Sequence, residues 1–265
     1  MSDTQTRLSK DVSSAFLKTL AMGLMLLNHT TDVLFETVFP AADTAELIFV
    51  IVTRASFIIF AFLTAEGLRM TSSRPKYFLR MAVFALISEP FFDLCFSGTF
   101  FDPSYQNVFF THALAIIGVS AEEKLREATG SRLSAAILIL PPAAALLLRC
   151  DYSLFGVAVI YLFYYFWKKD VRLTFVLLAV SCFTLLPLFL GLERLIFGTG
   201  AIDAAFFNTA FASAAVESAG LLILPLIEAY DGRRGRQINK YFYYAVYPAH
   251  LLLLGLLRFA VTRAG

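Results

Sequence analysis

Residues 14–36 read SAFLKTLAMGLMLLNHTTDVLFE, and this stretch decides the class of fold. It is long enough to cross a bilayer as a helix, which takes about 20 apolar residues. Asn28, His29 and Asp32 interrupt its second half, whereas the apolar region of a cleaved signal peptide is short and lacks such residues. We therefore expect a retained first membrane helix that carries polar side chains.

The composition of the whole chain agrees with a membrane protein. Hydrophobic residues make up 58% of the 265 residues and charged residues 16%, whereas about 25% of an average soluble domain is charged. A water-soluble fold of this length has no interior large enough for so many apolar side chains. The net charge of +2, without a basic stripe, excludes a protein that binds nucleic acid.

Apolar windows of about 17–25 residues predict an all-α fold, a polytopic transmembrane helix bundle of about nine spans (nine to ten). No linker or appended soluble segment is evident, so residues 1–265 are expected to form a single transmembrane domain. The predicted spans are 14–36, 46–69, 77–96, 106–121, 133–149, 153–168, 172–191, 205–229 and 241–259.

Basic residues alternate between the two sides that these spans imply. The N-terminus, with Arg7, Lys10 and Lys18, and the even-numbered loops together hold 17 of the 22 Lys and Arg residues. Because cytoplasmic loops of membrane proteins are enriched in Lys and Arg, we expect a cytoplasmic N-terminus and an external C-terminus.

The three cysteines, Cys95, Cys150 and Cys182, all lie in apolar runs. No Cys-x-x-Cys or Cys/His spacing is present, so no metal site is expected. We interpret them as buried thiols, with a Cys95–Cys150 disulfide as the alternative.

Charged and polar residues inside the spans form two layers. A charge in mid-bilayer costs at least about 2.5 kcal/mol and needs a partner or a function. The outer layer consists of His29, Asp32, Arg54, Glu89, Asp93, Asn107 and His112. The inner layer consists of Lys18, Glu66, Arg69 and Arg80, and the last two spans add Glu217 and His250. We interpret the two layers as one polar path through the bundle.

The same residues also have purely structural interpretations. Arg54 would form an ion pair with Glu89 or Asp93 that closes the bundle, and Glu66 would pair with Arg69 along one helix face. Three further residues would serve as hydrogen-bonded groups of the helix core: His112, His250 and Glu217.

Lys18 and His29 are eleven residues apart, which places both side chains on one face of a helix, about 16 Å apart along its axis. This arrangement puts a cation at the cytoplasmic rim and an imidazole deeper in the bilayer. A coenzyme A arm, an extended thiol tether attached to phosphates, fits that geometry. A neutral imidazole suits removal of a proton from a hydroxyl or an amine, and Asp32 would orient the ring.

Several stretches of the chain resemble one family. They are LK and MLLNH at 17–18 and 25–29, RASFIIFAFLTAEG at 54–67, ISEPFFD at 87–93, NVFFT at 107–111, DYS at 151–153 and YPAHL at 247–251. In this order they resemble the TraX family, bacterial membrane acetyltransferases named for the N-terminal acetylation of conjugative pilin. The resemblance implies a multi-pass protein of the bacterial inner (cytoplasmic) membrane that uses acetyl-CoA.

The Lys18-x10-His29 spacing is also similar to the Arg/Lys-x10-His motif of the membrane acyltransferase-3 family, which O-acetylates bacterial polysaccharides. In that family the histidine is regarded as catalytic and the acyl donor as cytoplasmic acetyl-CoA. The resemblance implies that His29 is the catalytic base or a transient acyl carrier, and that Lys18 is a donor-site cation.

We therefore predict an acyltransferase that moves an acetyl group from acetyl-CoA to an amine or hydroxyl acceptor, either a pilin N-terminus or a glycan. The expected partners are acyl-CoA, this acceptor and the lipid bilayer. The predicted catalytic residues are His29, Asp32, Arg54 and Asn107, the latter two as stabilisers of the oxyanion. The predicted donor-binding residues are Lys18, Arg69 and Arg80. The predicted acceptor-binding residues are Glu89, Asp93, His112 and His250.

Two other classes of function remain open at this point. A proton-coupled transporter or exporter would use the same residues as a proton relay, although no inverted halves or broken helix pairs are visible. A membrane scaffold for envelope assembly would leave the polar residues of the spans without a reason.

Overall fold

A computed structural model describes residues 12–37, 43–236 and 238–264, and within these ranges the regular structure is entirely helical, with no β-strand. The predicted all-α class is confirmed. Two of the basic residues used to predict the orientation, Arg7 and Lys10, lie outside the described residues.

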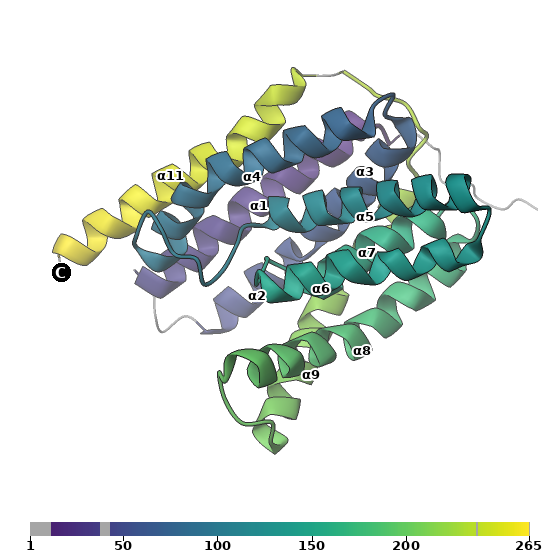
Figure 1. The fold of residues 1–265 in the computed structure, drawn as a ribbon. Coiled ribbons are helices and arrows are strands. Elements are labelled where there is room, and N and C mark those ends of the chain that lie inside the picture. Colours follow the sequence, from purple (N-terminus) through teal and green to yellow (C-terminus); the bar gives the residue numbers. More distant parts are fainter. Residues whose placement is uncertain (1–11, 38–42, 237, 265) are drawn as a thin grey trace, which may run out of the picture.

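The helices follow one another along the chain with short connections (Figure 1). They are α1 (Ser14–Thr37), α2 (Asp43–Thr53), α3 (Ala55–Met70), α4 (Arg74–Ser97), α5 (Val108–Thr129), η1 (Arg132–Ile139), α6 (Leu140–Leu147), α7 (Ser153–Tyr165), α8 (Val171–Phe197), α9 (Ala204–Ala219), η2 (Gly220–Ile223), α10 (Leu224–Glu228) and α11 (Lys240–Ala264).

Every predicted span coincides with one helix or with consecutive helices. The second span is divided at Arg54 between α2 and α3, the fifth consists of η1 and α6, and the eighth runs through α9, η2 and α10. Within the residues that the structure describes, four helical segments are long and apolar enough to cross a membrane by themselves: Leu47–Met70, Val171–Phe197, Ala204–Glu228 and Tyr241–Val261. In contrast, α1 and α4 have the length but carry more polar and charged residues, and α7 has only 13 residues.

Local sequence signals set several helix ends. Asn107, Asp170 and Asp203 precede α5, α8 and α9, and each side-chain oxygen accepts a hydrogen bond from a backbone N–H of the first turn, the usual role of an N-cap. α5 ends at Gly130, whose φ of +63° lies in the left-handed region that favours glycine.

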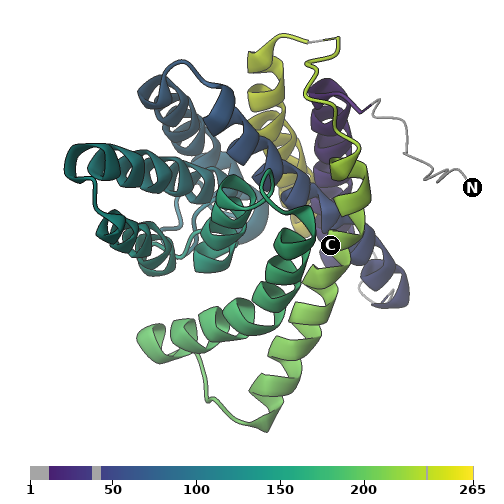
Figure 2. The same cartoon turned by 90° about the vertical axis from the view of Figure 1, so that its right-hand side faces the viewer.

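Six helices pack in a closed ring. Each helix contacts the next in the order α1, α3, α7, α5, α4 and α11, and α11 packs back against α1. α8 packs against α7 outside this ring, and α9 packs against α8. Figure 2 shows these two helices extending away from the ring. The ring therefore joins the first and last helices of the chain.

The outer surface of the bundle is strongly apolar. Along α8, Val176 is 54% exposed, Leu188 51% and Leu195 70%. A soluble monomer rarely exposes a large continuous apolar surface, whereas lipid tails solvate such a surface. This surface and the four long apolar segments identify a membrane protein.

Polar contacts tie together the loops at one end of the bundle, which we call the cationic end. Arg74, at the start of α4, forms an ion pair with Glu123 near the end of α5. Lys168, after α7, donates to Glu66 of α3 over 3.1 Å. The backbone N–H of Ser14, at the start of α1, donates to a carbonyl of the segment that precedes α11.

The loops at the opposite end are tied together in the same way. The backbone N–H of Gln106 donates to the carbonyl of Arg149, and the Arg149 guanidinium forms an ion pair of 3.0 Å with Glu193 of α8. Arg258 of α11 donates to the carbonyls of Cys95 and Phe96 at the end of α4. Among the described residues, the loops that follow the second, fourth, sixth and eighth predicted spans thus lie at one end, and those that follow the third, fifth and seventh spans lie at the other.

The cysteines are free thiols. Cys95, Cys150 and Cys182 are all buried and none forms a disulfide, which agrees with the interpretation as buried apolar residues. In the part of the chain that the structure describes, no group of three or more His, Cys, Asp or Glu residues is arranged to hold a metal ion.

Asn107 connects α4 with α5 and is fully buried. Its Oδ1 accepts from the N–H of Phe109 over 3.0 Å, and its Nδ2 donates to the carbonyl of Ala85 over 2.9 Å and to the Glu89 carboxylate. The amide predicted to stabilise an oxyanion is therefore engaged as an N-cap and as a link between two helices.

Replacing Asn107 by Ala is expected to destabilise the fold strongly. The change removes an N-cap, worth about 1 kcal/mol, and leaves buried acceptors unpaired at about 1–3 kcal/mol each. Thermal unfolding of the purified protein in detergent measures the effect. Asp203→Ala is the matched control, since it removes only the N-cap of α9, and it should lower the unfolding temperature less. Equal effects in the two variants would contradict this role of Asn107.

Candidate functional site

A cavity of about 410 Å³ lies inside the ring, lined by residues of α1, α3, α4, α5 and α11. Sites for small molecules usually have volumes of about 300–1,000 Å³. The helices that line the cavity come from both ends of the sequence, so the ring must close before the cavity exists.

One face of α1 forms a continuous wall of this cavity. Its lining residues follow a spacing of three or four: Ser14, Lys18, Met22, Met25 and His29. Such a spacing keeps side chains on one helix face. The predicted shared face of Lys18 and His29 is therefore present, and both side chains line the same cavity, about 16 Å apart along the helix axis.

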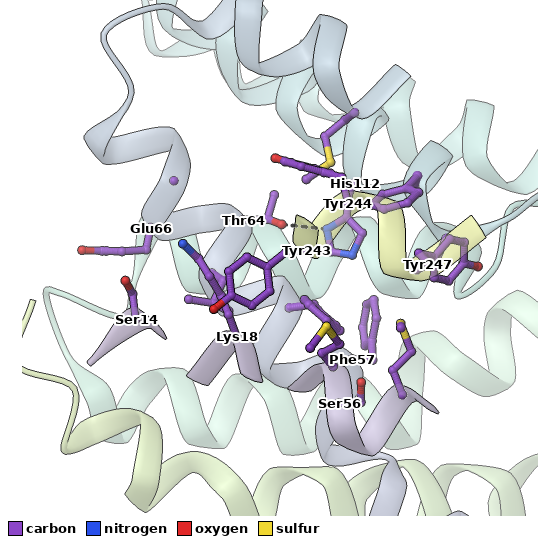
Figure 3. A pocket seen from close by; sticks show the side chains of 18 of the residues that line it. Ser14, Lys18, Ser56, Phe57, Thr64, Glu66, His112, Tyr243, Tyr244 and Tyr247 are labelled. Atoms are coloured by element: carbon purple, nitrogen blue, oxygen red, sulfur yellow. Dashed lines mark hydrogen bonds between the residues drawn. The ribbon is translucent and has the colours of Figure 1, made fainter. Parts of the chain in front are cut away.

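Three cations line the cavity at the cationic end: Lys18, Arg80 and Arg234. The Lys18 Nζ lies 5.8 Å from the centre of the Tyr243 ring, an arrangement that Figure 3 shows from close by. The Arg80 guanidinium lies 5.5 Å from the centre of the Tyr77 ring. Cations within about 6 Å of an aromatic face are attracted to it, so these rings help to hold the positive charges at this end of the cavity.

Arg69, the third predicted donor-binding cation, does not line the cavity. It donates to Glu66 over 3.0 Å and to the backbone carbonyls of Phe163 and Tyr164. These carbonyls belong to the last turn of α7, where helices leave acceptors unpaired. Arg69 thus clamps α3 to the end of α7, and the structural pairing of Glu66 with Arg69 is confirmed.

His29 lies at the other end of the α1 wall, against His250 of α11. The His29 Nδ1 and the His250 Nε2 are 2.7 Å apart, and the His250 Nδ1 is 2.8 Å from the carbonyl oxygen of Val246. Phe96 and Tyr247 make edge-on contacts with the His29 ring. His29 is therefore enclosed by side chains of α4 and α11.

Asp32, predicted to orient His29, is bonded to another side chain of α1. The Asp32 carboxylate accepts a hydrogen bond of 2.7 Å from Asn28, and the Asn28 carbonyl oxygen accepts from Thr53 over 2.6 Å. Asn28 and Thr53 line the cavity. Asp32 lies behind them and holds the Asn28 side chain in the cavity wall. The ring of His29 meets another imidazole instead of a carboxylate.

His112 lines the cavity nearer its middle and is buried. Its Nδ1 lies 2.8 Å from the hydroxyl oxygen of Thr64 on α3, the bond drawn as a dashed line in Figure 3. The Phe57 ring lies 6.0 Å from that of His112. His112 is thus both a hydrogen-bonded core residue and part of the cavity wall.

Arg54 forms its ion pair with Glu217 of α9 over 2.9 Å, so the expected pairing with Glu89 or Asp93 is wrong. The guanidinium also donates to the Tyr152 hydroxyl over 3.3 Å. Tyr152 lines the cavity, whereas Arg54 does not, and an oxyanion role for Arg54 has no support in this geometry.

Glu89 and Asp93, predicted to bind the acceptor, do not line the cavity. Glu89 accepts from Asn107, and Asp93 accepts from the backbone N–H of Asp102 over 2.9 Å. Both carboxylates therefore anchor the loop between α4 and α5. In that exposed loop, hydrogen bonds from the hydroxyls of Ser104 and Ser97 lower the pKa of Asp102 to about 2, so it stays charged at neutral pH.

The cavity wall also includes Asp151, Tyr152 and Arg234, which are not among the predicted site residues. Asp151 and Tyr152 belong to a turn in which Arg149, Tyr152 and Ser153 have positive φ. Non-glycine residues in this region cost energy and cluster at functional sites. The DYS motif was the available signal, but its backbone conformation is not visible in sequence.

Comparison with known proteins gives one match. The family model described as TraX protein matches residues 13–258. No curated protein and no solved structure matches the chain. The family match covers nearly the whole chain and every residue of the cavity wall, and the chain therefore belongs to the TraX family.

Proposed function

We propose that this chain is an integral-membrane acyltransferase that moves an acetyl group from cytoplasmic acetyl-CoA to an amine or hydroxyl acceptor. The observation that carries the proposal is the single cavity that joins the cations Lys18, Arg80 and Arg234 to His29. The association of the TraX family with pilin acetylation supports it. Acceptors of this kind are a pilin N-terminus or a glycan hydroxyl.

The proposed topology has nine spans in a single transmembrane domain of the bacterial inner membrane, with the N-terminus in the cytoplasm. The gathering of even- and odd-numbered loops at opposite ends of the bundle supports it. In this orientation the cationic end faces the cytoplasm, where acetyl-CoA is found, and the positive-inside rule is satisfied.

The donor enters from the cationic end. Lys18, Arg80 and Arg234 attract its phosphates, and the thiol arm extends along the α1 wall toward His29. Met22 and Met25, between Lys18 and His29, line this part of the cavity and offer apolar contacts that adapt to a ligand. The similarity of Lys18-x10-His29 to the acyltransferase-3 motif agrees with this path.

The chemical step needs one base. The His29 imidazole takes the proton of a neutral amine or a hydroxyl while the acceptor's lone pair attacks the thioester carbonyl carbon. The carbon–sulfur bond then breaks, and the coenzyme A thiolate leaves and takes the proton back from the imidazolium. Donor and acceptor held in one cavity turn a reaction between two compartments into one positioned encounter.

Replacement of His29 by Gln is expected to lower acetyl transfer by about 10²–10⁴-fold, the usual contribution of a general base. Radiolabelled acetyl-CoA with purified protein and membranes measures the transfer. Donor binding and the unfolding temperature should remain unchanged in this variant. Unchanged turnover would exclude His29 from the chemistry, and a wild-type protein without any transfer would favour the transporter.

Removing a cation from the cavity entrance is expected to weaken donor binding. Lys18→Ala or Arg234→Ala should raise the KM for acetyl-CoA by about 10-fold, because a hydrogen bond to a charged group contributes about 1.5–3 kcal/mol. Arg126→Ala is the matched control, since Arg126 is 52% exposed and pairs with Glu122 away from the cavity. An equal rise in the control variant would contradict a donor site at Lys18 and Arg234.

The proposed topology predicts the behaviour of reporter fusions. Alkaline phosphatase, which is active only outside the cytoplasm, should be active when fused after Gly265. A green fluorescent protein fused after Arg234, in the segment that precedes α11, should fluoresce because that segment lies in the cytoplasm. A tenth span would place the C-terminus inside and reverse the first result.

A further inference from the structure

The geometry of the contact between His29 and His250 shows which ring nitrogens carry hydrogen. The two ring centres are 5.0 Å apart and the ring planes differ by only 13°, while the nearest nitrogens are 2.7 Å apart. Two nearly coplanar imidazoles therefore meet edge to edge, nitrogen to nitrogen. At that distance one nitrogen must carry a hydrogen and the other must present a lone pair.

The carbonyl of Val246 decides between the two arrangements. It lies 2.8 Å from the His250 Nδ1 and can only accept a hydrogen bond, so this nitrogen carries the proton. A neutral His250 then has an unprotonated Nε2. Both rings are taken as neutral, because a buried charge inside the membrane is costly. The hydrogen of the contact therefore belongs to the Nδ1 of His29, and its Nε2 keeps a lone pair.

We propose that His250 is a positioning residue that fixes His29 in the tautomer with a protonated Nδ1 and a basic Nε2. The proposal rests on the proposed role of His29 as the base, and it identifies Nε2 as the nitrogen that takes the acceptor's proton. In the step, the acceptor's proton moves to the His29 Nε2 and returns from there to the coenzyme A thiolate. The Nδ1–H bond to His250 remains in place throughout.

The same geometry argues against His250 as an acceptor-binding residue. Its Nδ1 is engaged with Val246 and its Nε2 with His29, so neither ring nitrogen is left to bind an acceptor. Tyr247, three residues before His250 on α11, contacts both imidazole rings from the edge, with ring centres 6.0 and 5.5 Å away. Ring rotation that would break the bond is therefore hindered by packing.

Nitrogen-15 NMR of the full chain, labelled at histidine and held in lipid nanodiscs, tests the tautomer directly. The chain has only three histidines, so His29→Gln, His250→Gln and His112→Gln assign the rings. In the wild type, the His29 Nδ1 should give the signal of a protonated nitrogen and the Nε2 that of an unprotonated one. The opposite pattern, or an equal mixture, would overturn the proposal.

Two substitutions of His250 separate positioning from packing. His250→Gln keeps an acceptor oxygen for the His29 N–H, so the tautomer should persist, whereas His250→Leu removes the acceptor and the preference should be lost. His112→Gln is the matched control, because His112 bonds Thr64 and not His29, and it should leave the His29 signals unchanged. A His29 tautomer that persists in His250→Leu would also overturn the proposal.

Kinetics add an independent readout. In His250→Leu, kcat for acetyl transfer should fall by about 10–100-fold, as when an orienting partner is lost, with KM for acetyl-CoA unchanged and with partial recovery in His250→Gln. Equal loss in both variants would reject the positioning role. If the wild type transfers no acetyl group, the proposed function fails, while the NMR signals still decide the tautomer.

Discussion

The cost of burying polar groups in an apolar bundle is the constraint on which this structure depends. A charge or a hydrogen-bonding group inside the membrane must find a partner or face water. Here the partners lie behind the cavity wall: Asp32 accepts a hydrogen bond from Asn28, Glu217 pairs with Arg54, and Glu89 accepts from Asn107. Because these groups are satisfied by one another, the cavity wall itself can present His29 and Lys18 to a ligand.

The groups that hold the helices together and the groups that line the cavity therefore have different roles. Arg69 illustrates the first kind, since its guanidinium satisfies the last carbonyls of α7 and a carboxylate of α3. Lys18 and Arg234 illustrate the second, since both line the cavity. A count of charged residues per helix does not distinguish those that join helices from those that line the cavity. The tertiary structure makes this distinction.

Features that depend on a single helix could be predicted from the sequence. Apolar windows locate every helical segment, although the predicted fourth span ends at 121 and α5 continues to Thr129. The shared face of Lys18 and His29 follows from helical periodicity alone. Contacts between distant segments were not accessible: His29 and His250 are 221 positions apart, and nothing in the spacing of Arg54 points to α9 rather than to α4. The expected partners were therefore Asp32 for His29, and Glu89 or Asp93 for Arg54. In the structure the partners are His250 and Glu217.

The closure of the ring by its first and last helices has a consequence for the order of assembly. α1 leaves the ribosome first and α11 last, so the imidazole of α1 enters the membrane long before its neighbour from α11 has been synthesised. The cavity thus acquires its last wall only when α11 docks against α1 and α4, so early and late segments of this chain must meet before a ligand can be enclosed.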